Sequence, residues 1–423
     1  MLIFAPLKRE LDMLEYNTTT LDCGLRIVHR HNDSNVGYCG VMVDCGTRHE
    51  QHPADYGMAH FTEHILFKGT SHRDAWHINQ RIESVGGELN AFTTKEDTTF
   101  YATFLARDFA RACELVCDLI CHPTAPQHEL EKEQEVVIEE IESYRDNPAE
   151  LIYDVFENRL YAGTPLGHNI LGSEETVRRF NHDRCLDFIH RNYTPGRMIF
   201  FSYGPMSWQQ VVRQVERYFD LQPTAMTGTD GTSAPTSDII TTEPTEVESQ
   251  HQSHCILGAR TYPIGHPDAA ALALLNNVLG GPGMNSRLSQ QLREKRGLVY
   301  TVESNLTNYT DGGYMSIYFG CDPTDTERCM RLCRRELQRL IDSPLTPRQL
   351  RAAQQQYKGQ LGIGTANLEN NALTLAKSLL RLGRIDSLDQ ASARIDAVTS
   401  DQICRVAHEL FADGRLVEVR SRN

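Results

Sequence analysis

Long apolar runs are missing from this chain of 423 residues. A membrane-spanning helix needs about 18 or more consecutive apolar residues, and no such run occurs. The start of the chain also lacks a basic region ahead of its short apolar run, which a signal peptide would have. We therefore expect a soluble, cytoplasmic protein that makes no contact with a membrane.

An excess of basic residues is also missing. The chain has 42 Lys and Arg against 56 Asp and Glu, which gives a formal net charge of −14. Binding to nucleic acid phosphates needs a basic surface, so we expect no nucleic acid partner. Apolar residues make up 40% of the chain and charged residues 23%, an ordinary balance that argues against disorder.

Cys-x-x-Cys pairs are absent although the chain has 12 cysteines. Cys113, Cys117 and Cys121 follow one another at four-residue steps, as do Cys329 and Cys333. This spacing lines one face of a helix, where a free cysteine behaves as a small buried apolar residue. Reduced core thiols are therefore favoured over a thiolate metal site or a disulfide framework.

The chain contains a weak internal repeat. The sequence HPAD at 52–55 opens an apolar helical run, and HPDA at 266–269 opens another about half a chain later. Each follows a segment with the composition of a strand. The pairs at 125–126 and 346–347 precede long polar helices with a similar offset. The repeat predicts two similar domains, each of which mixes a sheet with helices.

A polar stretch separates the two halves. It is rich in Thr, Ser, Gly, Pro and Asp and has little apolar periodicity, which is typical of a linker. We predict a first domain over 1–222, a linker over 223–247 and a second domain over 248–423. Because the helices cluster instead of alternating strictly with strands, the fold class is expected to be α+β.

The sharpest motif is HFTEH at 60–64. His60 and His64 are four residues apart, so both imidazoles project from one face of a helix and can bind one zinc ion. Glu63 lies beside them, close enough to act on a zinc-bound water. The order H-x-x-E-H is the inverted form of a zinc peptidase signature. The alternative is a helix with two hydrogen-bonded histidines and a solvated glutamate.

The rest of this helix has an ordinary amphipathic pattern. Asp55 is a plausible N-cap, and Met58, Phe61 and Ile65 have the spacing of a core-facing stripe. The equivalent helix of the second half has mostly apolar residues in place of the motif, namely Leu274, Asn277 and Val278. The two histidines are therefore not needed for burial, which favours a chemical role.

A catalytic zinc needs a third protein ligand and an open position for water. The acid-rich segment 129–144 is the best source of that ligand. Glu140 lies beside an expected buried stripe of Val137, Ile141 and Tyr144. Glu133 is seven residues earlier, about 10 Å away along a helix axis, too far to share the ion. A solvated acidic helix face is the open alternative, and spacing alone does not choose between the two.

The sequence resembles the pitrilysin family of zinc metallopeptidases, which includes insulinases and processing peptidases. The matching pieces of the first half are HFTEH at 60–64, GGELNA at 86–91, VVIEEI at 136–141 and DNP at 146–148. Those of the second half are LGG at 279–281, MNSRL at 284–288 and LREKRGLVY at 292–300. Pro282 departs from the family pattern, since it lengthens the glycine loop by one residue.

The resemblance implies a fold and a set of site residues. The fold has two similar domains, each a mainly antiparallel sheet flanked by helices, which together form half of a clamshell. His60, His64 and Glu140 would bind one Zn²⁺ per chain, with Glu63 as the general base and Glu133 as an auxiliary acid. The residues expected to contact substrate are Asn90 and Ala91, in an exposed strand at 89–94 that pairs with the substrate backbone, and Arg293 and Tyr300 in the second half.

These expectations add up to a zinc-dependent endopeptidase that hydrolyses extended or unfolded peptides inside a closed chamber. The resemblance also implies assembly as a homodimer, with a heteromer containing a related subunit as the alternative. Two other functions stay open at this point. One is a non-catalytic scaffold or partner subunit of the same fold, and the other is an unrelated soluble protein in which the motif arose by chance.

Overall fold

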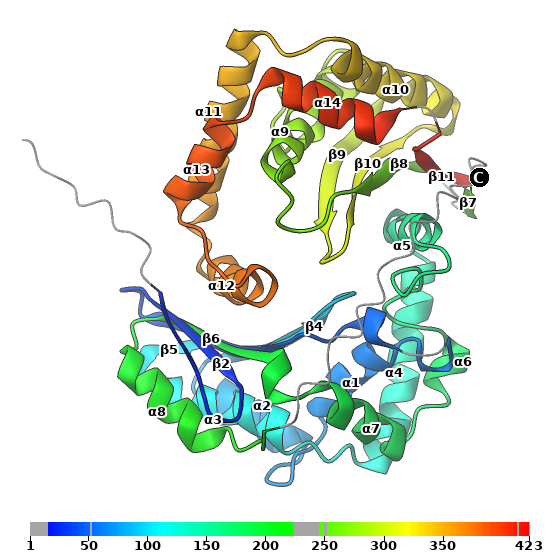
Figure 1. The fold of residues 1–423 in the computed structure, drawn as a ribbon. Helices are drawn as coiled ribbons and strands as arrows, with labels where there is room; N and C mark the ends of the chain where they lie inside the picture. Colours follow the sequence, from blue (N-terminus) through cyan, green and yellow to red (C-terminus); the bar gives the residue numbers. More distant parts are fainter. Residues whose placement is uncertain (1–15, 51–52, 224–244, 249–251, 413, 423) are drawn as a thin grey trace, which may run out of the picture.

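The computed structural model describes residues 16–50, 53–223, 245–248, 252–412 and 414–422 (Figure 1). It contains two β-sheets, one in each half of the chain, and helices pack on both. None of the helices in these ranges combines the length and the apolar character needed to cross a membrane.

The first sheet has six strands in the order β1-β2-β6-β3-β5-β4. β2 and β6 are parallel, and the other neighbouring pairs are antiparallel. β4 forms one edge, so that its outer side has no partner strand in the described sheet. The strands are β1 (Asn17–Thr20), β2 (Arg26–His31), β3 (Val36–Val43), β4 (Glu88–Thr93), β5 (Thr98–Leu105) and β6 (Met198–Gly204).

Helices of the first half cover one face of this sheet. Phe61 on α1, Phe100 on β5 and Phe109 on α3 are fully buried in the core between them. The described helices of the first half, of which α5 packs on the second sheet, are α1 (Met58–Leu66), α2 (Ala75–Glu83), α3 (Phe109–Cys121), α4 (Gln127–Arg145), α5 (Pro148–Leu160), α6 (Glu174–Val177), α7 (His182–Asn192) and α8 (Trp208–Tyr218).

The second sheet has the order β7-β11-β8-β10-β9. Its strands are β7 (Thr245–Glu248), β8 (Ser253–Thr261), β9 (Val299–Asn308), β10 (Gly313–Cys321) and β11 (Val417–Arg422). The helices of this half are α9 (Ala269–Gly280), α10 (Thr326–Asp342), α11 (Pro347–Gly364), α12 (Leu368–Leu382), α13 (Leu388–Asp396) and α14 (Ser400–Phe411).

The two sheets repeat one another strand by strand. The order β7-β11-β8-β10-β9 matches β2-β6-β3-β5-β4, and the first pair of each series is the parallel one. By chain order, α9 corresponds to α1, α11 to α4 and α12 to α5. The predicted α+β fold of two similar domains, each with a mainly antiparallel sheet flanked by helices, is therefore confirmed.

Each sheet buries its second face against a helix from the other half. Ile152 and Phe156 of α5 pack with Ile256 of β8, although α5 belongs to the first half. In return, Leu375 of α12 packs with Phe201 of β6 (Figure 1). The exchange makes each half depend on the other for the burial of one sheet face.

The turns of two equivalent hairpins also meet. The turn between β4 and β5 contains Glu96, which accepts a hydrogen bond from the backbone N–H of Thr310 at 3.0 Å, in the turn between β9 and β10. Arg48 bonds Asp311 of the same turn at 2.6 Å. These contacts fix edge strand β4 relative to edge strand β9.

The linker predicted over 223–247 falls largely on residues outside the described ranges, although β7 covers its end. The domain boundaries therefore stay predictions. All 12 cysteines are free and most are buried, as expected for core thiols.

The ion pairs of Arg381 are the basis of a stability prediction. This α12 residue bonds Asp44 and Asp97 of the first half, and its side chain is only 5% exposed. Arg381→Ala removes this cation from both carboxylates. Asp97, which is shielded from water, keeps Lys377 at 3.6 Å. We expect the free energy of unfolding to fall by about 3–5 kcal/mol, measured by urea denaturation.

Arg384→Ala is the matched control because Arg384 is exposed and pairs only with Asp386 among the described residues. Its loss should stay within about 1 kcal/mol. Equal losses in the two variants would contradict the importance of the interdomain pair.

Candidate metal centre

Helix α1 is capped from outside its own sequence. Its N-cap is Gly57, which has φ of 95° and no side chain that could accept a hydrogen bond. Glu50 takes over this task, since its carboxylate accepts from the N–H of Gly57 at 3.0 Å and of Ala59 at 2.9 Å. The predicted N-cap Asp55 is therefore wrong. Asp55 lies ahead of the helix and bonds Arg184 instead.

Glu50 is itself held in place by His168 and Tyr56. His168 Nε2 lies 2.9 Å from Glu50, and the His168 ring stacks on Tyr56 with 3.7 Å between ring centroids. Burial raises the pKa of Glu50, and the two backbone hydrogen bonds oppose that shift. The start of α1 is thus set by a buried polar network whose members come from three separate segments.

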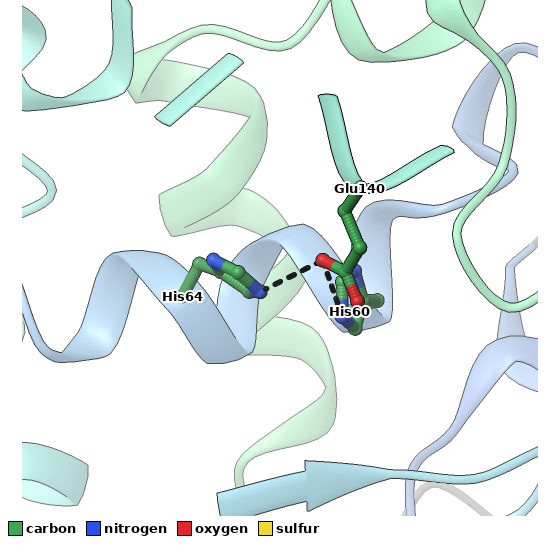
Figure 2. A group of neighbouring side chains, drawn as sticks. All are labelled: His60, His64 and Glu140. Carbon is green, nitrogen blue, oxygen red and sulfur yellow. Dashed lines mark ion pairs between the residues drawn. The ribbon is translucent and has the colours of Figure 1, made fainter. Parts of the chain in front are cut away.

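The two faces of α1 have different surroundings. Met58, Phe61 and Ile65 are buried in the core, as the periodicity predicts. His60 and His64 share the opposite side, with 4.6 Å between their ring centroids, and face α4 (Figure 2). The buried stripe predicted for α4 is confirmed only in part. Val137 and Ile141 are buried, but Tyr144 is 36% exposed because it lies in the last turn, just before α4 ends at Arg145.

Glu140 of α4 reaches between the two histidines (Figure 2). Its Oε2 lies 3.8 Å from His60 Nε2 and 3.7 Å from His64 Nε2. Two zinc bonds of about 2.0–2.2 Å at a tetrahedral angle span roughly 3.4 Å, so these atoms stand within a few tenths of an ångström of zinc-ligand spacing. Two imidazoles and one carboxylate are also a donor set that zinc takes. The residues present therefore fit the metal.

Glu133 lies behind His64 and outside the three-residue cluster. Its Oε2 accepts from His64 Nδ1 at 3.1 Å, and its Oε1 pairs with Lys68 at 2.5 Å. A carboxylate on Nδ1 fixes the tautomer of the imidazole and turns the Nε2 lone pair toward a metal. Burial raises the pKa of Glu133, but the bonds from His64 and Lys68 outweigh it and hold the pKa below its usual value.

The protonation of the two imidazoles differs. Burial, together with the nearby His64, lowers the pKa of His60 to about 3, so that His60 is neutral near pH 7. Burial also acts to lower the pKa of His64. The hydrogen bond that His64 donates to Glu133, together with the surrounding carboxylates, outweighs this and raises the pKa of His64. A metal at Nε2 would replace the proton that these carboxylates favour.

Glu63 points to a different neighbour. Its Oε2 accepts a hydrogen bond of 2.6 Å from the hydroxyl of Thr93, the last residue of β4. Burial raises the pKa of Glu63, the Thr93 hydrogen bond opposes the shift, and Glu140 adds to it. A carboxylate with a raised pKa is a better proton acceptor than one in water.

The predicted substrate residues lie elsewhere. Asn90 and Ala91 are half-buried on edge strand β4. Arg293 lies in the short helical segment Ser289–Glu294, and Tyr300, on β9, is 84% exposed. No hydrogen bond or ion pair joins any of these four residues to the histidine cluster in the described structure.

Three residues that support this centre have no sequence motif. Thr93 contacts Glu63 because β4 ends beside α1, Lys68 lies in the turn after α1, and Glu50 is ten residues from His60. Each is a common polar residue, and its spacing from the HFTEH motif matches no known pattern. Only the assembled fold brings them to the site.

The cap supplied by Glu50 can be tested by stability. Glu50→Ala leaves the N–H groups of Gly57 and Ala59 buried without an acceptor, so we expect the free energy of unfolding to fall by about 2–5 kcal/mol in denaturant titrations. Glu50→Gln keeps one acceptor oxygen and should lose clearly less. If the two variants are as stable as the unsubstituted chain, Glu50 does not hold α1.

Two family models match the chain, one after the other. The model described as insulinase (peptidase family M16) matches residues 26–174, which contain the cluster. The model described as peptidase M16 inactive domain matches residues 179–357. This second stretch contains α9, where Leu274, Asn277 and Val278 stand in place of the motif.

Individual proteins align over nearly the whole chain. An uncharacterized zinc protease of Bacillus subtilis is 33% identical over 395 residues, covering 93% of this chain and 95% of that protein. The mitochondrial-processing peptidase subunit beta of Bos taurus is 28% identical over 413 residues, covering 95% and 83%. A solved protease structure from Helicobacter pylori has a TM-score of 0.90 at 21% identity, covering 97% and 100%, which shows the shared fold. The chain therefore belongs to the insulinase family of peptidases, family M16.

Proposed function

We propose that the protein is a zinc-dependent endopeptidase that hydrolyses extended or unfolded peptides. The observation that carries this proposal is the cluster itself: His60, His64 and Glu140 converge with zinc-ligand spacing, and Glu63 lies on the same helix beside them. One Zn²⁺ per chain is proposed. Bound zinc would supply Lewis-acid chemistry that makes water nucleophilic near neutral pH and polarises the scissile carbonyl.

The residues of the chain perform the proton transfers and the positioning. Glu63 takes the proton of the attacking water and later delivers it to the leaving amine. Thr93 holds the Glu63 carboxylate by its hydrogen bond of 2.6 Å, so that one oxygen stays directed and the other is free to accept the proton. Glu133 orients His64, which makes it a positioning residue.

Edge strand β4 supports the proposed substrate class. Its outer side has no partner strand among the described residues, so a peptide can add there as a further strand. Such pairing needs an extended backbone, which favours unfolded segments over folded proteins. Asn90 and Ala91 are proposed to make this contact. Arg293 would hold a substrate carbonyl, and Tyr300 would donate to the developing oxyanion.

A non-catalytic scaffold is the less favoured function, because the complete set of proposed ligands and the proposed base are present. We further propose that the chain works in the cytoplasm as a homodimer that closes the chamber around the peptide. Light scattering of the purified protein tests the dimer, and a monomer at micromolar concentration would oppose it.

The role of Glu63 is tested with Glu63→Gln. The amide cannot accept the proton of the attacking water, so cleavage of a quenched peptide library should fall by about 10²–10⁴-fold. The zinc content should stay unchanged because Glu63 is not among the proposed ligands. Glu139→Gln is the control, since Glu139 is exposed on α4 next to Glu140. A Glu63→Gln variant that cleaves as fast as the unsubstituted chain would exclude Glu63 as the base.

The contribution of the second half is tested with Tyr300→Phe and Arg293→Ala. Loss of a donor to the oxyanion should lower kcat in Tyr300→Phe by about 10²–10³-fold. Arg293→Ala should mainly raise KM, because it removes an interaction made equally before and during the reaction. Arg296→Ala, which removes an exposed arginine nearby, should change neither constant. Unchanged kinetics in both test variants would show that these two side chains do not contact the peptide.

A further inference from the structure

A second group of metal-binding side chains lies outside the proposed active site. His72, Asp118 and His122 each offer one ligand atom, and these atoms lie within 4.8 Å of one another. His72 is in the loop between α1 and α2, whereas Asp118 and His122 lie at the end of α3. The proposed peptidase mechanism uses none of the three.

The Asp118 carboxylate is held in one orientation. Its Oδ2 accepts a hydrogen bond of 2.9 Å from the Thr70 hydroxyl and pairs with Arg73. Its Oδ1 is left for the histidines and lies 2.6 Å from His72 Nδ1 and 3.1 Å from His122 Nδ1. Two imidazole nitrogens therefore converge on one buried oxygen whose partner oxygen is already satisfied.

His122 lies between two carboxylates. Its Nδ1 faces Asp118, and its Nε2 faces Asp220 Oδ2 at 3.1 Å. A neutral imidazole has one N–H, so it can donate to only one of these two acceptors. The other contact needs a second proton or a cation. With the proton on Nε2 bonded to Asp220, the Nδ1 lone pair faces Asp118, which is the arrangement of a metal-binding histidine backed by a carboxylate.

From this geometry we propose a second zinc site, bound by His72 Nδ1, His122 Nδ1 and Asp118 Oδ1. Mixed imidazole and carboxylate donors suit Zn²⁺, whereas Mg²⁺ and Ca²⁺ require mainly oxygen. The His72 side chain is 57% exposed and lines an open surface cleft with Trp76 and His77. An ion can enter from this side, where water completes its coordination. His72 Nδ1 and Asp118 Oδ1 are 2.6 Å apart, closer than the roughly 3.4 Å between two ligand atoms of one zinc, so His72 would move outward when the ion binds.

The neighbouring cation does not block the site. Arg73 bonds the Asp118 oxygen that is turned away from both histidines, and it also pairs with Glu114. Its charge is therefore shared between two carboxylates, while Asp220 adds another negative charge on the far side of His122.

The ion would join a loop to a helix. Residues 68–74 follow α1 directly, and Ser71 already bonds the carbonyl of His122 at 2.9 Å. The same loop carries Lys68, the partner of Glu133 behind His64. A zinc on His72 and His122 would therefore fix this loop on α3 and act as a structural staple next to the peptidase centre.

The test counts zinc ions bound to protein that has been freed of metal, by calorimetric titration with Zn²⁺ and by elemental analysis. The unsubstituted chain should bind two ions, and His72→Ala/His122→Ala should bind one. His60→Ala/His64→Ala should also bind one, with a thermal midpoint that Zn²⁺ still raises. His77→Ala is the matched control, because His77 is an exposed histidine bonded to Asp74, and it should keep both ions.

Two further variants keep the test decisive. His72→Ala alone removes an exposed side chain and leaves the core untouched, so weakened binding cannot be attributed to misfolding. Asp220→Asn should weaken the second site by about 10–100-fold without removing it. The proposal is overturned if His60→Ala/His64→Ala binds no zinc, or if His72→Ala/His122→Ala binds as many ions as the unsubstituted chain. If the unsubstituted chain binds one ion and only His72→Ala/His122→Ala loses it, the result instead contradicts zinc at the proposed active site.

Discussion

In the described part of the chain, a helix from the other half covers one face of each sheet. α5, from the first half, packs on β8 and β11 of the second sheet, and α12, from the second half, packs on β3 and β6 of the first sheet. The exchange ties the site to the second half, because α4 ends at Arg145 and α5 begins at Pro148. The helix that carries Glu140 is thus joined by a two-residue connection to a helix that packs on the opposite sheet. Arg381 adds a buried ion pair between the two halves.

The proposed metal centre is assembled by independent restraints on α1. Glu50 fixes its first turn, the core packs against Phe61 and Ile65, and Glu133 holds His64. These restraints come from segments before α1, from the sheet and from α4. Precise placement of a ligand set needs side chains that are themselves held by neighbours. The centre has such neighbours on His64 and Glu63, and β4 supplies both the Thr93 hydroxyl and the edge that suits a peptide backbone.

The sequence predicted the repeat, the fold class and the residues that converge between α1 and α4. These features depend on local spacing: His60 and His64 share a helix face because of helical geometry, and the two halves preserve their order of elements. It did not predict that Glu50 caps α1, that Thr93 contacts Glu63, or that α5 and α12 each pack on the sheet of the other half. The Thr93 contact and the helix exchange depend on which distant segments meet. The cap depends on one polar side chain outside the helix, which leaves no periodic pattern. Asp55 illustrates the limit, since it has the right residue type but the helix begins after Gly57.

The comparison of α1 with α9 shows why α9 carries no equivalent of the proposed zinc ligands. At the place of His60, α9 has Leu274, which is fully buried in an apolar core. Placing imidazoles and a carboxylate on such a helix removes them from water, and burial moves the pKa of His60 down and that of Glu63 up. Those shifts disfavour the charged forms unless partners compensate. In the first half the partners are Thr93, Glu133 and Lys68, which lie on β4, on α4 and in the loop after α1. A metal centre on this scaffold therefore requires coordinated changes on several elements, and substituting the motif alone into α9 would leave buried polar groups unsatisfied.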